Sequence, residues 1–98
     1  MLKLNAFGDI LLGRELGKKV RDSIKDMLSK ENKLIIDCYG VKGTSQSFAD
    51  ECFGRLVEEM GLENFKVKIK IQNAEPEIQS IIKYTVISRV HNQLIKAK

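Results

Sequence analysis

Hydrophobic residues recur at steps of three and four between residues 14 and 30, and this spacing predicts an amphipathic helix. A second pattern of the same kind predicts a helix over 47–60, which we expect to stop at Gly61 because glycine favours helix ends. The outward face of this second helix should carry its polar residues, namely Asp50, Glu51, Arg55, Glu58 and Glu59.

Four segments carry the patterns of strands. "KLIIDCYG" at 33–40 has consecutive branched apolar residues, which predict a strand buried on both faces at the centre of a parallel sheet. "KVKIKIQ" at 66–72 alternates strictly, so we expect a strand whose lysines line a sheet edge or a wet face. Near the start, "LKLN" and "DILL" predict a short hairpin that turns at Gly8 and Asp9.

The stretch "NAEPE" at 73–77 predicts the start of a last helix, with Asn73 as its cap and Pro76 in its first turn. Apolar residues then recur at helical spacing and should form its buried stripe. They are Ile78, Ile81, Ile82, Val86, Val90 and Leu94.

The predicted order of elements is therefore β-β-α-β-α-β-α. Strands separated by helices favour a mostly parallel or mixed four-stranded sheet with about three helices, in an α/β layer. The chain has 98 residues, 43% hydrophobic and 31% charged, and no linker divides it, so we expect one globular domain over 1–98. It shows neither a signal peptide nor an apolar run long enough to span a membrane.

The net charge of +4 is unevenly distributed. Residues 32–65 hold three Lys or Arg against six Asp or Glu, whereas residues 66–98 hold seven against two. A basic C-terminal third can steer an anionic partner, or it can be an ordinary solvated surface. Nucleic-acid binding through the lysines is an alternative function, but few aromatics and no recognition motif make it the weaker one. Those lysines are Lys66, Lys68, Lys70, Lys96 and Lys98.

Catalytic and metal-binding patterns are missing from the sequence. His91 is the only histidine, and Cys38 and Cys52 fit no metal-ligand spacing, so we expect two buried free thiols in a reducing compartment. No nucleophile stands beside a base. These observations predict a protein that is not an enzyme and that has no cofactor and no metal.

Three hydroxyls, those of Thr44, Ser45 and Ser47, precede the 47–60 helix. Ser47 and Asp50 have the spacing of a capping box, in which the hydroxyl accepts from a first-turn amide. The hydroxyl can serve only as a cap, or it can also accept a phosphate, which a helix N-terminus stabilises. The residues alone leave both interpretations open.

Asp37 ends the predicted central strand, where α/β sheets bind ligands. It can contact a ligand there or accept amide hydrogen bonds from the 40–45 turn, and we favour the structural role. Gly40 and Gly43 should supply positive φ in that turn. "GVKGTS" lacks the spacing of a phosphate-binding loop.

The segment "LIIDCYG" followed by "VKGTSQSFADECFGRL" resembles the STAS-like family of unknown function, which is related to STAS domains of anti-sigma factor antagonists. The match is most specific at Asp37, Gly40, Val41 and 48–51. The resemblance implies a regulatory, non-enzymatic module of the bacterial or phage cytoplasm. It would bind a histidine-kinase-like ATPase through the 39–47 loop and the 47–60 helix, and self-association is left open.

In the related antagonists, an Asp-Ser-Ser-Gly turn begins the helix and its second serine is phosphorylated. Placed without gaps on this chain, that turn corresponds to "SQSF" at 45–48, so Ser47 is the candidate phosphoacceptor while the other three positions differ. The resemblance also implies the residues that would contact the partner. They are Tyr39, Lys42, Thr44, Ser45, Gln46, Asp50 and Glu51.

Overall fold

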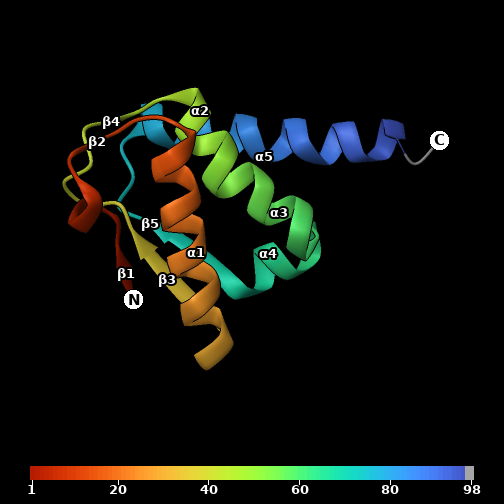
Figure 1. The fold of residues 1–98 in the computed structure, drawn as a ribbon, viewed down its shortest axis with the longest axis horizontal. Coiled ribbons are helices and arrows are strands. Elements are labelled where there is room, and N and C mark those ends of the chain that lie inside the picture. The colour runs from red at the N-terminus through yellow and green to blue at the C-terminus, as the bar shows by residue number, and fades with distance from the viewer. Residues whose placement is uncertain (97–98) are drawn as a thin grey trace.

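A computed structural model describes residues 1–96 and shows two small parallel sheets (Figure 1). The main sheet has the strand order β1-β3-β5, and its strands are Leu2–Lys3, Leu34–Asp37 and Ile69–Gln72. The second sheet pairs β2 (Ile10–Leu11) with β4 (Gly43–Thr44). All strand pairs are parallel, and β3 lies between its two neighbours, as its apolar sequence predicts.

The hairpin expected at the start is wrong. β1 pairs with β3 and β2 pairs with β4, so the first two strands belong to different sheets. A short 3-10 helix, η1 (Leu4–Phe7), separates them and places the side chain of Leu4 in the core. The four-stranded sheet is consequently replaced by a three-stranded sheet and a separate strand pair.

Helices account for most of the chain. The predicted 14–30 helix is α1 (Arg14–Lys30). The predicted 47–60 helix begins at Gln46 and runs unbroken through α2 (Gln46–Ala49), a π-helical segment η2 (Asp50–Gly54) and α3 (Arg55–Met60). We call the whole of Gln46–Met60 the central helix. It stops at Gly61, whose φ of +85° ends the helix as expected.

The strand expected over 66–72 is wrong in its first half. Residues Leu62–Lys68 form α4, and only Ile69–Gln72 form β5. Leu62 and Phe65 pack against the core at a three-residue step, whereas Val67 is 63% exposed. The short alternation at 66–68 therefore reflects exposed helical positions, and the lysines of this segment do not share one strand face.

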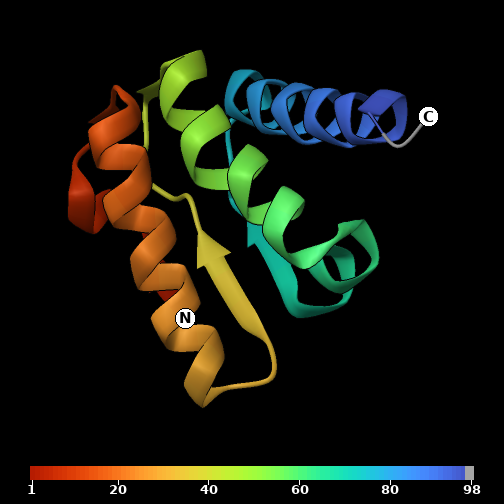
Figure 2. The ribbon, with the colours of Figure 1, turned by 45° about the vertical axis from the view of Figure 1, so that its right-hand side comes forward.

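The helices cover one face of the main sheet (Figure 2). Leu34 and Ile36 are buried beneath them, but Ile35, on the other face, is 38% exposed. The burial of β3 on both faces, expected from its sequence, is therefore wrong. The central helix packs between α1 and α5 (Pro76–Lys96), so it is enclosed on two sides as well as by the sheet.

The last helix, α5, begins at Pro76 and extends beyond the body of the molecule (Figure 1). Ile78, Ile82 and Val86 are buried as predicted, but Leu94 is 62% exposed because the helix has by then left the core. Asn73 is not its cap. It has a φ of +59°, and its side-chain amide donates to Asp37 at 3.0 Å.

Cys38 and Cys52 are free and fully buried, as the sequence predicts. Among residues 1–96, no helix combines the length and the apolar character that crossing a membrane requires.

Candidate functional site

The connection from β3 to the central helix lies at the carboxyl end of the main sheet. Tyr39 is 72% exposed, Lys42 is exposed, and Val41 anchors the connection in the core. Gly40 has a φ of +84°, as predicted, but Gly43 lies in β4 without a positive φ, so that expectation is wrong. The connection is thus fixed to the fold and reaches solvent.

Asp37 holds the start of this connection. Its Oδ1 accepts the amide of Tyr39 and the side-chain amide of Asn73, each at 3.0 Å. These two donors, led by Asn73, lower the pKa of Asp37. Asp37 therefore accepts hydrogen bonds within the fold, but its donors lie outside the 40–45 turn from which the sequence analysis expected them.

Ser45 is the cap of the central helix. Its Oγ accepts the amide of Phe48 at 3.1 Å and the amide of Gly13, at the start of α1, also at 3.1 Å. One hydroxyl therefore serves the first turns of two helices. The capping box expected at Ser47 and Asp50 is wrong, because Ser47 is the second residue of the helix and not its cap.

The hydroxyl of Ser47 lies 3.0 Å from that of Ser45. Because the Ser45 oxygen already accepts two amide hydrogens, we assign its own hydrogen to this contact, with the Ser47 oxygen as acceptor. The Ser47 hydrogen is then directed elsewhere. Ser47 lines a hollow of about 420 Å³ together with Arg14, Asp50 and Tyr84.

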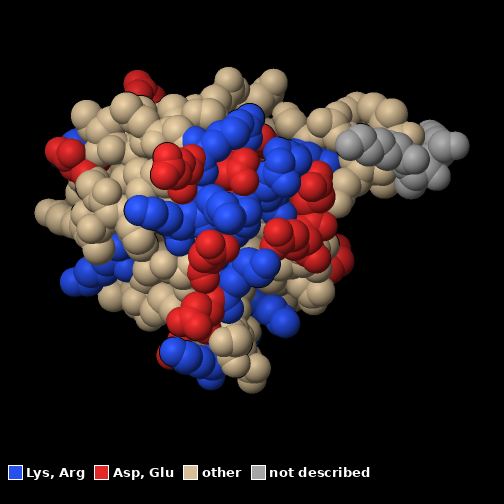
Figure 3. Space-filling view, in the orientation of Figure 1, with Lys and Arg blue, Asp and Glu red and all other residues tan. Residues whose placement is uncertain are grey.

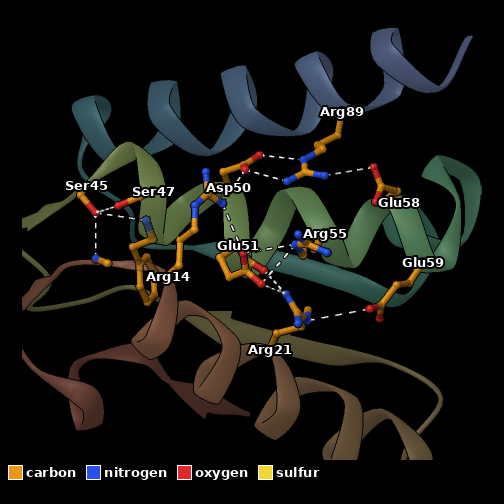
Figure 4. A network of polar contacts seen from close by, with 12 residues as sticks. Arg14, Arg21, Ser45, Ser47, Asp50, Glu51, Arg55, Glu58, Glu59 and Arg89 are labelled. Atoms are coloured by element: carbon orange, nitrogen blue, oxygen red, sulfur yellow. Dashed lines mark hydrogen bonds and ion pairs between the residues drawn. The ribbon is translucent and has the colours of Figure 1, made fainter. Parts of the chain in front are cut away.

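Asp50 is held by two arginines from opposite sides. Arg89 of α5 contacts both of its oxygens, at 2.8 and 2.7 Å, and Arg14 of α1 contacts Oδ2 at 2.9 Å. Hydrogen bonding from Arg89 is the main cause that lowers the pKa of Asp50 to about 2. Asp50 therefore remains ionised and links the central helix to both neighbours (Figure 4).

Glu51 does not lie on an outward face, contrary to the expectation. It is 8% exposed and contacts Arg21 at 3.0 Å, Arg14 at 3.2 Å and Arg55 at 3.2 Å. Burial raises the pKa of Glu51, but hydrogen bonds from Arg21 and Arg14 outweigh it and lower the pKa overall. The helical pattern predicted one buried face, but the central helix is covered by α1 as well as by α5. Glu51 therefore lies between helices and not at the surface.

The remaining candidates lie close to these groups. Gln46 is exposed at the first turn of the central helix, and Thr44 is half-buried in β4. The Oγ1 atom of Thr44 is buried and has no hydrogen-bond partner among residues 1–96. His91 is exposed on α5 and takes no part in the hydroxyl and ion-pair cluster.

The arginines of this site gave no signal in the sequence. Arg14 and Arg89 lie 36 and 39 residues from Asp50, and no periodic pattern reports ion pairs over such separations. In space, positive and negative side chains alternate across the face formed by α1 and the central helix (Figure 3). Within residues 1–96, no three His, Cys, Asp or Glu side chains cluster as metal ligands would.

Comparison with known proteins identifies the family. The family model described as "STAS-like domain of unknown function (DUF4325)" matches residues 17–79. The chain belongs to this family of STAS-like domains. No curated protein and no solved structure matches it.

The matched region of the STAS-like domain runs from α1 to the first turn of α5. It includes Ser45, Ser47 and both carboxylates of the site. Arg14 and Arg89, which hold Asp50, lie outside it. The two ion pairs of Asp50 thus reach beyond the matched residues, whereas the pair of Arg21 with Glu51 lies within them.

Proposed function

We propose that this STAS-like domain is a non-enzymatic regulatory module that binds a partner protein at the carboxyl end of its main sheet. Family membership supports a regulatory role. The partner is a histidine-kinase-like ATPase of the kind that related antagonists bind, acting in a bacterial cytoplasm. The observation that carries the proposal is Ser47, whose hydroxyl lines an open hollow at the first turn of the central helix.

The docking surface combines polar and apolar side chains, which we call the rim surface: Ile10, Leu12, Tyr39, Lys42 and Gln46. All five are exposed. Ile10 belongs to β2, which pairs with β4, so it lies beside the connection that carries Tyr39 and Lys42. Exposed apolar side chains grouped with polar ones are typical of surfaces that bind proteins.

The central helix contributes less than the sequence suggested. Glu51 is occupied by arginines inside the fold, so we assign it to positioning the helix and not to partner contact. Asp50 is about three-quarters buried and is likewise engaged by Arg14 and Arg89. Of the partner-contact residues expected on the central helix, Gln46 is exposed, and with Ser47 it forms the first turn that we assign to the docking surface.

A phosphate on Ser47 would change this surface through Arg14. The side chain of Arg14 is 55% exposed and lines the same hollow as Ser47. If it turned to a phosphate, Asp50 would keep Arg89, and Glu51 would keep Arg21 and Arg55. A phosphate adds about −1.5 to −2 charges, so the rim would become more negative while no carboxylate lost its last partner.

The direct test is titration of the purified domain with the histidine-kinase-like ATPases of its genome, in the presence and absence of ATP. We expect one of them to bind the wild type and Ser47→Ala, and to lose affinity for Ser47→Asp. Glu63→Gln, an exposed change on α4, is the matched control and should bind as the wild type does. The proposal fails if none of these ATPases binds the wild type.

A further inference from the structure

The strand β5 lies at the border of the main sheet and offers unpaired backbone groups. The carbonyl of Gln72 accepts from Cys38, at 2.9 Å, on the side of β3. Since successive residues of a strand direct their backbone groups to alternate sides, those of Ile71 and Ile69 point to the free edge. The Ile69 amide donates to Phe65, but within residues 1–96 no strand pairs with the Ile69 carbonyl or with the two backbone groups of Ile71 on that side.

An apolar groove of about 570 Å³ runs beside this edge, between α4 and the first half of α5. Most of its lining is aliphatic or aromatic, and Ile71 of β5 forms part of it. Ile87 on its α5 side is 55% exposed. The other apolar side chains that line it are Leu62, Phe65, Ala74, Ile82 and Val86.

A second hollow, of about 660 Å³, adjoins β5 and is lined by four lysines: Lys33, Lys66, Lys68 and Lys70. Lys66 and Ile71 line both hollows, so the two meet at the free edge. All four arginines form ion pairs, but none of these lysines lies within ion-pair distance of a carboxylate in the part of the chain described. Their charge is available to a ligand.

We propose that β5 binds an extended acidic segment of a partner protein, which adds a fourth strand to the sheet. Side chains of a strand alternate between two faces, so its apolar residues would enter the groove and its acidic residues would face the lysines. A second copy of this chain fits poorly, because pairing two β5 edges would bring like-charged lysines together. This surface is separate from the rim surface and does not depend on Ser47.

The experiment uses a capped synthetic peptide of alternating valine and glutamate as the probe, titrated into the domain by NMR. We expect the amides of residues 69–73 to shift and the Ile71 amide to become protected from hydrogen exchange. Methylation of alternate peptide amides in one frame should abolish binding, and methylation in the other frame should leave it. Such frame dependence identifies backbone pairing and not simple charge attraction.

Charge is tested with Lys70→Gln and Lys66→Gln, which should each weaken binding by about twofold to fivefold. Lys18→Gln, an exposed lysine of α1, is the matched control and should leave the affinity unchanged. The proposal is overturned if residues 69–73 do not shift, or if both methylated peptides bind as well as the parent. It is also overturned if an oligouridylate binds this edge more tightly, or if the domain dimerises through β5.

Discussion

Arg89 of α5 holds both carboxylate oxygens of Asp50 on the central helix, with its Nε at 2.8 Å from Oδ1 and its Nη2 at 2.7 Å from Oδ2. Its Nη1 also donates, at 3.1 Å, to Glu58, which lies further along the central helix, in α3. Gly54 makes this approach feasible, since a Cβ there would lie 2.8 Å from Asp50 Oδ1 and 3.0 Å from Arg89 Cγ. A planar fork of donors thus joins the last helix to the middle of the fold.

Arg89→Lys should lower the free energy of unfolding by about 1–2 kcal/mol, because an ammonium cannot reproduce the two parallel hydrogen bonds. Urea denaturation followed by circular dichroism measures this. The control is Arg55→Lys. The Arg55 side chain is half exposed where it pairs with Glu51 at i,i+4, so this change should cost no more than about 0.5 kcal/mol. Equal losses for the two variants would show that the paired geometry at Arg89 does not matter.

The stability of the domain should depend on the ionisation of Asp50. Its folded pKa is about 2, below the ordinary value of 3.8, so its contribution is complete above the ordinary value and is lost as pH falls toward 2. We expect the stability difference between the wild type and Asp50→Asn to be constant at neutral pH and to shrink by about 1 kcal/mol in acid, allowing for solvent screening.

Unfolding curves of both proteins at a series of pH values measure that difference. Asp37→Asn serves as a comparison, because Asp37 pairs with neutral donors at the surface and not with arginine. Stability profiles of the wild type and Asp50→Asn that run parallel down to acid pH would contradict the assignment.

The elements that one-dimensional periodicity predicts correctly are those with a single buried face over many residues. The helix at 14–30 is of this kind. The strand at 34–37 was predicted from consecutive apolar residues instead, and its place in the chain was right while its burial on both faces was not. At 66–68, three alternating residues could not distinguish a strand from exposed helical positions. The segment is helical, with Phe65 packed into the core. The burial of Ile35 depends on whether helices cover one or both faces of the sheet. The sequence of the strand alone does not contain that information.

The sequence indicated which residues stand at the start of the central helix but not which contacts they make. Serines 45 and 47 both lie at the start of the central helix, and the structure identifies Ser45 as the cap because its Oγ accepts the amides of Phe48 and Gly13. The arginines that hold Asp50 and Glu51 come from α1 and α5, whose distance from the central helix along the chain hides them. These contacts join elements that are distant in the chain and follow no sequence period, so the sequence analysis could not predict them.

At Gly17, α1 lies close against the central helix. A Cβ at this position would lie 2.8 Å from the carbonyl oxygen of Phe48 and 2.9 Å from Glu51 Cβ, so Gly17→Ala should separate the helices and lower stability by about 1–3 kcal/mol. Gly43→Ala is the control, because nothing lies within 4 Å of a Cβ there. Thermal melts of both variants test this, and an unchanged melting temperature for Gly17→Ala would contradict the tight packing.

The two thiols should react slowly in the native protein. Burial, and then the nearby Asp37 charge, raise the pKa of Cys38 to about 11, and burial likewise raises the pKa of Cys52. A chromogenic disulfide reagent at mildly alkaline pH should therefore modify both only as fast as the domain opens, and rapidly in denaturant. Prompt reaction of either thiol under native conditions would show that the core around it is accessible.

Alanine substitution should destabilise the domain at Ser45 but hardly at Ser47. Ser45→Ala removes the acceptor of two helix-starting amides and should lower the free energy of unfolding by about 1–2 kcal/mol. Ser47→Ala removes only the acceptor of the Ser45 hydroxyl, which can turn to water, so we expect a loss below about 0.5 kcal/mol. Chemical denaturation of both variants measures the contrast. If Ser47→Ala were the more damaging change, Ser47 would be a structural residue, and its hydroxyl could not be modified without disturbing the fold.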